Sequence, residues 1–313
     1  MIASIAMMET RYHRFSSYLR QRFGCRVYRV PLDAGFTCPT RDGTISRGGC
    51  LYCDSRGSAA MRADRGLSVR EQMLSGMDGM RRRYGAAKFI AYFQAFTNTY
   101  GPTDHLKQLY TEATDLPDVV GLSIGTRPDC VPDEVLDLIA SFVTRFDTWI
   151  EYGLQSAHDS TLRAINRGHT VAQFSDAVSR TAARGIKVCA HIILGLPGET
   201  GGMMNETARF IARLPVDGVK IHLLHVLKGS PLEKLYSEDK IALLPQEGYV
   251  AIVCDFLELL SPTVVIQRLT GEAPRENLVA PLWALDKHAV LRAITSELEK
   301  RDSWQGKNSA SPA

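Results

Sequence analysis

The chain of 313 residues has no apolar run long enough to cross a membrane. A membrane-spanning helix needs about 20 mainly apolar residues, and the apolar segment Val250–Leu260 is interrupted by Asp255 and Glu258. The apolar start, Met1–Met8, is not preceded by the basic stretch of a secretory signal. These absences predict a cytoplasmic protein with no membrane partner.

Net charge and cysteine are also low. The formal net charge of +3 does not by itself indicate nucleic-acid binding, and 45% hydrophobic with 23% charged residues excludes collagen and disordered tails. Seven cysteines, an odd number in a chain without an export signal, argue against a disulfide framework. Four of them are scattered and are expected to fill the core: Cys25, Cys130, Cys189 and Cys254.

What the sequence does contain is a regular alternation of strand and helix patterns. Runs rich in β-branched and aromatic residues predict six strands, at Arg26–Asp33, Lys88–Phe93, Val119–Ile124, Thr148–Gly153, Ile186–Leu194 and Gly218–Val226. The predicted helices are Ser68–Tyr84, Thr103–Thr114, Pro132–Val143, Thr170–Arg184 and Thr200–Arg213. Such repeated units imply right-handed crossovers and a parallel sheet. The expected fold class is therefore α/β, with the sheet curled into a partial (β/α)6 barrel.

The alternation changes after residue 227. The later elements are predicted as helices at Pro231–Glu238, Gln246–Leu260 and Trp283–Arg301, with a strand at Val264–Leu269. We expect four segments: a basic amino-terminal extension (1–25), the barrel core (26–227), an α/β extension packed on the barrel (228–301) and a polar, frayed tail (302–313).

Three cysteines share one glycine-rich loop directly after the first predicted strand. Cys38, Cys50 and Cys53 have the spacing C-x11-C-x2-C and follow the carboxyl end of a strand, where barrels place their active sites. Three thiolates can hold an iron–sulfur cluster and leave one iron open to another ligand. A zinc site would need a fourth ligand, for example His13 or Cys25, and a redox pair at Cys50 and Cys53 would leave Cys38 unexplained. The spacing favours the cluster, and the two alternatives stay open.

Further motifs resemble the radical S-adenosylmethionine (SAM) superfamily, in the branch that contains the Elongator catalytic subunit. The matching segments are Gly125–Asp129 (GTRPD), Glu151–Ser156 (EYGLQS), Arg167–His169 (RGH) and His191–Glu199 (HIILGLPGE). Three others resemble the YhcC/YtqA-type radical SAM proteins: Asp33–Pro39 (DAGFTCP), Ile221–Gly229 (IHLLHVLKG) and Val265–Glu272 (VIQRLTGE). The resemblance covers about residues 10–290 and implies that the barrel is a partial (β/α)6 radical SAM barrel with terminal extensions.

The resemblance implies two cofactors, a [4Fe–4S] cluster held by Cys38, Cys50 and Cys53 and SAM bound to its open iron. In this superfamily one electron cleaves SAM to methionine and a 5′-deoxyadenosyl radical, which abstracts hydrogen from the substrate. The electron is expected from a low-potential donor such as flavodoxin or ferredoxin.

The resemblance also implies residues that contact SAM. They are Gln94 for the amino group, Gln155 for the ribose, Arg167 or its neighbour Arg163 for the carboxylate, and Gly195 for the adenine side. Gln94 stands where related proteins have Gly-Gly-Glu, and Gly125 stands where the Elongator branch usually has Glu. These two departures from the family pattern concern the residues expected at the SAM amino group and ribose.

The segment Arg11–Arg29 is basic and aromatic and contains no acidic residue. Its cations and rings are Arg11, Arg14, Arg20, Arg22, Arg26 and Arg29, and Tyr12, Phe15, Tyr18, Phe23 and Tyr28. Such a mixture suits the phosphates and unstacked bases of RNA, and the run Arg81–Arg83 adds more positive charge. The alternative is an amphipathic helix that docks on the barrel and leaves its basic side in solvent.

Three histidines fall on or near the fifth and sixth predicted strands. His191, His222 and His225 are either substrate contacts inside the barrel or hydrogen-bonded packing residues. His222 and His225 are an odd number of residues apart, so they are not expected to share a strand face.

Three functions are compatible with these features. The first is a radical SAM enzyme that modifies the side chain of a tRNA wobble uridine, as relatives in the Elongator branch act on that nucleotide. The second is a radical SAM oxidoreductase for a tetrapyrrole or another small metabolite. The third is a zinc-stabilised nucleic-acid-binding protein without enzymatic activity.

Overall fold

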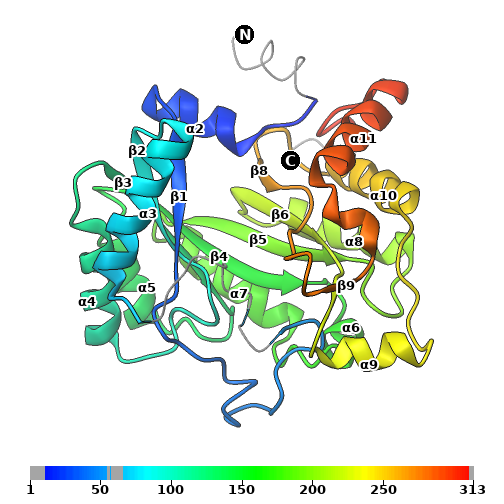
Figure 1. Ribbon diagram of the computed structural model, residues 1–313, viewed down its shortest axis with the longest axis horizontal. Helices are drawn as coiled ribbons and strands as arrows, with labels where there is room; N and C mark the ends of the chain where they lie inside the picture. The colour runs from blue at the N-terminus through cyan, green and yellow to red at the C-terminus, as the bar shows by residue number, and fades with distance from the viewer. Residues whose placement is uncertain (1–10, 55–56, 58–65, 310–313) are drawn as a thin grey trace.

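The computed structural model describes residues 11–54, 57 and 66–309. Within them, seven strands form one sheet in the order β1-β2-β3-β4-β5-β6-β8, and all neighbouring pairs are parallel. Their bounds are β1 (Val27–Leu32), β2 (Lys88–Phe93), β3 (Val119–Thr126), β4 (Asp147–Gln155), β5 (Lys187–Leu194), β6 (Gly218–Leu223) and β8 (Val265–Arg268). The sheet curls into a half-barrel (Figure 1). The expected partial barrel is confirmed, and β8 adds a seventh strand to the six of the expected core.

Helices alternate with the strands and cover the outside of the sheet (Figure 1). They are α2 (Phe15–Phe23), α3 (Val69–Tyr84), α4 (Thr103–Thr114), α5 (Asp133–Ala140), α6 (Asp159–Ala164), α7 (Val171–Ala182), α8 (Gly201–Ala212), α9 (Pro231–Ser237), α10 (Gln246–Leu259) and α11 (Lys287–Lys300). A small antiparallel pair joins β7 (Val226–Leu227) to β9 (Leu278–Ala280). Ser68 and Glu71 form a capping box at the start of α3, which fixes the entry into that helix.

The two faces of the sheet differ in chemistry. Along β6, Val219, Ile221 and Leu223 are buried in the apolar core under the outer helices. Because successive side chains of a strand point to opposite faces, Lys220 and His222 face the inside of the half-barrel. The inside is therefore polar at positions where a closed apolar barrel would carry packed aliphatic side chains.

Helix α2 docks across the open edge of the half-barrel and contacts both β1 and β8. The rings of Phe15 and Tyr18 meet Trp149 edge-on, with centroids 6.2 and 5.8 Å apart. Arg22 lies 3.2 Å from the buried carboxylate of Asp147. Part of the basic segment is therefore structural. Figure 1 shows α2 at one end of the strands and the loop after β1 at the other.

Two expectations about the carboxyl-terminal part are wrong. The helix expected at Trp283–Arg301 is divided into a 3-10 turn, Leu282–Leu285, and α11, because the Asp286 side chain accepts a hydrogen bond from the Ala289 amide (2.8 Å) and starts a new helix. The tail is packed over 302–309 instead of frayed. The Gln305 side chain is fully buried and bonds the His13 amide, the Ser261 carbonyl and the Val264 carbonyl.

Candidate active site at the carboxyl ends of the strands

The loop that follows β1 carries the three clustered cysteines. Its backbone is tied to the segment between α6 and α7: the Leu51 amide donates to the Ile165 carbonyl (3.0 Å), and the Asn166 side chain donates to the Gly49 carbonyl (2.7 Å). Gly48 and Gly49 both have positive φ, which lets the chain curl between Cys38 and Cys50. The loop is thus held at the carboxyl ends of the strands, as expected from its place in the sequence.

The three thiols lie close enough to influence one another. Cys38 receives a hydrogen bond from Thr97 Oγ1 (3.0 Å), and Cys50 Sγ lies 3.7 Å from an Arg167 nitrogen. Burial, with a contribution from the neighbouring Cys50 and Cys38, raises the pKa of Cys53 to about 11, although Arg41 opposes this shift. Burial likewise raises the pKa of Cys38. Such thiols become thiolates when a bound metal centre supplies positive charge.

Three thiols are the donor type that holds an iron–sulfur cluster, whereas structural zinc normally takes four protein ligands. The donor set of three thiols therefore fits a [4Fe–4S] cluster with one open iron.

Arg167 is buried beside Cys50. It is 7% exposed, and its Nε and Nη2 donate to the Gly153 carbonyl at 3.1 and 2.7 Å. A Cβ atom at Gly153 would lie 2.6 Å from Arg167 Nη2 and 2.5 Å from Gln155 Nε2, so a larger residue there would displace the ends of both side chains. The end of β4 is therefore built to hold a guanidinium against the cysteine loop, and Arg167 is not a solvated helix-end cation.

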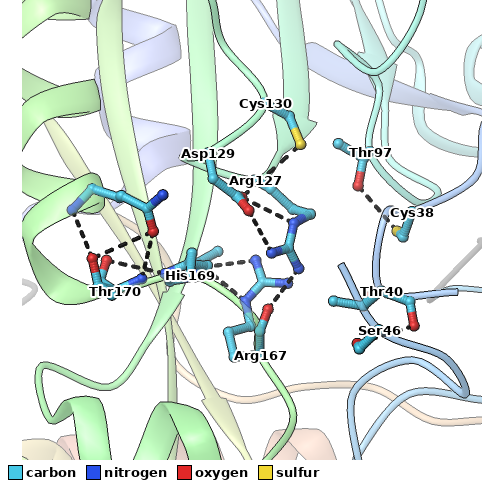
Figure 2. Close-up of polar contacts among 12 residues, drawn as sticks. Cys38, Thr40, Ser46, Thr97, Arg127, Asp129, Cys130, Arg167, His169 and Thr170 are labelled. Atoms are coloured by element: carbon cyan, nitrogen blue, oxygen red, sulfur yellow. Dashed lines mark hydrogen bonds and ion pairs between the residues drawn. The ribbon is translucent and has the colours of Figure 1, made fainter. Parts of the chain in front are cut away.

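The TRPD turn after β3 braces Arg167 from the other side. Arg127, which is 2% exposed, makes two hydrogen bonds to the Asp129 carboxylate (3.0 and 2.7 Å) and donates to the Arg167 carbonyl (2.7 Å). Figure 2 shows Arg127 between Asp129 and Arg167, with Cys38 and Thr97 nearby. His169 Nε2 also donates to the Gly153 carbonyl (2.9 Å). Burial, reinforced by Arg167 and Arg127, lowers the pKa of His169 to about 3, so this imidazole is neutral.

The other residues predicted to contact SAM follow strands β2, β4 and β5 or lie on α6. Gln155 is buried at the end of β4 with a φ of 74°, a strained conformation for a residue with a side chain. Gln94 follows β2, and its backbone N–H donates to the Leu32 carbonyl (3.3 Å). Gly195 has a φ of 82° at the turn after β5, where Leu244 packs against it. Arg163 is exposed on α6, so the structure brings Arg167 to the cysteines and leaves Arg163 in solvent.

Comparisons with known proteins agree with this geometry. Residues 43–211 match the model of the radical SAM superfamily, and residues 216–300 match the radical SAM C-terminal domain. The chain belongs to the radical SAM superfamily. It is 45% identical over 299 residues to the uncharacterised protein YtqA of Bacillus subtilis (strain 168), covering 96% of this chain and 93% of that protein.

Two further matches lie in the Elongator branch. The chain is 29% identical over 185 residues to a tRNA uridine(34) acetyltransferase of Dehalococcoides mccartyi (strain CBDB1), covering 58% of this chain and 39% of that protein. The solved structure of Elp3 from Methanocaldococcus infernus shares the fold, with a TM-score of 0.67, 16% identity, and coverage of 89% of this chain and 64% of that one. The resemblance drawn from the sequence motifs is confirmed.

Membership of the superfamily makes the chain a radical SAM enzyme that uses a [4Fe–4S] cluster and SAM. The zinc-stabilised binding protein without activity is therefore set aside. Within the described part of the chain, no helix has the length and apolarity of a membrane span.

Sequence reasoning missed several residues that build the site. Arg127, Gly153 and His169 lie inside motifs that were recognised by resemblance, but nothing in the sequence alone gave them a physical role. Arg127 donates to the Arg167 carbonyl, and the Gly153 carbonyl accepts from Arg167 and His169, so these contacts join the ends of β3 and β4 to the loop before α7. That convergence depends on strand order and register, which motif spacing does not contain.

Proposed function

We propose that this radical SAM enzyme acts on tRNA, at the side chain of the wobble uridine. A relative that matches 185 residues of this chain is named tRNA uridine(34) acetyltransferase, which supports this substrate class. The observation that carries the proposal is a basic groove along the open edge of the half-barrel.

The groove has a volume of about 940 Å³ and lies between α2, β1, α3, β8 and α11. Six cations line it: Arg14, Arg20, Arg26, Arg29, Arg268 and Lys287. Glu272 is the one carboxylate among its described lining residues, and it pairs with Lys287. The aromatic lining includes Tyr28 and Tyr84, whose rings stack with centroids 5.1 Å apart. Excess positive charge beside aromatic faces is the chemistry that holds single-stranded nucleic acid.

At the other end of the strands, the proposed cluster ligands are Cys38, Cys50 and Cys53. When bound, the cluster supplies the electron that cleaves SAM reductively. Arg167 is proposed to bind the SAM carboxylate, since its Nη1 faces Cys50 while its other nitrogens are fixed to Gly153. Gln155, Gly195 and Gln94 are proposed to contact the ribose, the adenine and the amino group.

Salt-dependent RNA binding tests the proposal. Each cation that neutralises a phosphate releases a counterion, so the affinity for an anticodon stem–loop RNA is expected to fall steeply with salt. Replacing Arg14, Arg20 and Arg26 by Gln is expected to flatten the slope of log affinity against log salt by about 2 to 3 units. Arg22 is kept, because it pairs with buried Asp147. The slope is measured by fluorescence anisotropy with cluster-loaded protein.

A matched control removes three exposed cations from the outer helices. Lys107 lies on α4, Arg209 lies on α8 and Arg213 caps α8. Their joint replacement by Gln changes net charge equally and is expected to leave the slope unchanged. Equal slopes in the groove variant and the wild type would show that the groove does not contact the RNA phosphates. Absence of salt-dependent RNA binding by the wild type would favour the tetrapyrrole or small-metabolite substrate.

A further inference from the structure

The inner face of the half-barrel carries a buried charge network on its strands. Glu151 on β4 lies 3.0 Å from Arg29 Nη2 on β1 and 2.8 Å from His191 Nε2 on β5, and it pairs with Lys220 on β6. Lys220 Nζ also lies 3.0 Å from the Tyr92 hydroxyl on β2. Although burial opposes ionisation, Lys220 and Arg29 hold the pKa of Glu151 well below its usual range. This network joins five strands across the inner face of the half-barrel.

Two further histidines lie beside this network: His222 is near the carboxyl end of β6, and His225 follows that strand. The rings of His222 and His191 have centroids 5.6 Å apart, and both His222 and His225 lie against Gly271, just past β8. His222 and His225 do not share a strand face, because β6 ends at Leu223 and His225 lies beyond it. The Nε2 atoms of His222 and His225 are buried and have no hydrogen-bond partner within the described residues.

Both imidazoles are neutral. Burial, reinforced by Arg268, lowers the pKa of His225 to about 4. Burial, followed by Arg268, holds the pKa of His222 well below its usual range. A neutral imidazole offers one donor and one acceptor, which suits a neutral ligand with both kinds of group. Buried polar atoms without partners are costly, so two of them on rings that both lie beside Gly271 indicate a ligand that completes their hydrogen bonds.

We propose that His222 and His225 bind the hydrogen-bonding edge of the uracil base of the target nucleotide. The uracil edge alternates carbonyl acceptors with an N–H donor, which matches two neutral imidazoles. Arg268 lies near both histidines and also lines the basic groove. A nucleotide whose backbone lies in the groove can therefore place its base on the histidines. This inference rests on the proposed function and adds the residues that select the base.

The test is a double-mutant cycle between protein and RNA. Cluster-loaded wild type and the His222→Phe variant are each titrated with two anticodon stem–loop RNAs, one with uridine at the wobble position and one abasic there. The wild type is expected to lose about three- to tenfold in affinity for the abasic RNA, as one or two hydrogen bonds are lost. The variant is expected to bind the abasic RNA as the wild type does and to show a smaller preference for the uridine RNA, because only His225 remains to contact the base. His105→Phe, on the exposed side of α4, is the control and keeps the wild-type difference.

The outcomes distinguish a contact with the base from a structural role of His222. Equal losses for both RNAs in His222→Phe would show a structural role and overturn the inference. An undiminished preference for uridine in this variant would also overturn it. These results differ from failure of the proposed function, in which the wild type does not bind either RNA.

Discussion

At the scale of single residues, the site depends on one backbone carbonyl. Gly153 O accepts from Arg167 Nε, Arg167 Nη2 and His169 Nε2, while Arg127 holds the Arg167 backbone. These contacts fix the guanidinium before any ligand binds, so little side-chain entropy is lost on binding. The planar fork of arginine is needed for two parallel bonds to a carbonyl or carboxylate, which lysine cannot make.

Arg167→Ala is the residue-scale prediction for SAM binding. Loss of a charge-assisted pair with the SAM carboxylate is expected to weaken SAM binding by about 10- to 100-fold, while iron content stays near that of the wild type. The measurement is equilibrium titration of the cluster-loaded protein with SAM. Arg163→Ala, one turn away and exposed, is the control with wild-type affinity. An unchanged affinity of Arg167→Ala for SAM would show that Arg167 does not contact SAM.

At the scale of elements, periodicity and turn residues predicted most of the fold. The strands of the core and the long helices α3, α4, α7, α8 and α10 lie where the sequence places them. Short elements were missed, because the six residues of α6 and the two of β7 are too few for a period to emerge. The break between the 3-10 turn and α11 was not predicted, because a polar residue such as Asp286 is also compatible with a continuous helix. The hydrogen bond from the Ala289 amide to its side chain shows that it begins a new helix.

The site was predictable to a lesser extent. The cysteine loop could be placed because its cysteines follow a strong strand signal, and Arg167 because it belongs to a recognised motif. The choice of Arg167 over Arg163 needed the structure, since both stand at the end of the same short helix in sequence. The pairing of Glu151 with Lys220 and Arg29 joins three separate strands and depends on their register.

Gln305 gives the element-scale prediction for stability. Its side chain joins the amino-terminal segment at His13 to the segment before β8 at Ser261 and Val264. Gln305→Ala leaves these buried groups without partners and is expected to lower the free energy of unfolding by about 2–4 kcal/mol. Urea titration measures this value. Gln108→Ala, at an exposed residue bonded to Glu112, should change it by less than about 0.5 kcal/mol. Equal effects would show that the tail does not stabilise the fold.

At the scale of the whole molecule, the half-barrel separates the cysteine loop from the basic segment of α2. The cysteine loop lies at one end of the strands and α2 at the other (Figure 1). The basic groove runs along the open edge between β1 and β8, and Arg29 belongs both to this groove and to the inner charge network. A bound strand of RNA in the groove would therefore reach the polar interior from the side, while SAM occupies the end that carries the cysteines.

The central claim is that three cysteines of one loop hold a cluster that cleaves SAM. It is tested most directly by measuring 5′-deoxyadenosine, with iron content, after anaerobic reconstitution and reduction with dithionite in the presence of SAM. The wild type and Cys130→Ala, whose thiol is buried beside Asp129, are expected to hold about four irons per chain and to form 5′-deoxyadenosine. Single Ala replacements of Cys38, Cys50 and Cys53 are expected to abolish both. Full iron content and product in any of these three variants, or loss of both in Cys130→Ala, would contradict the account.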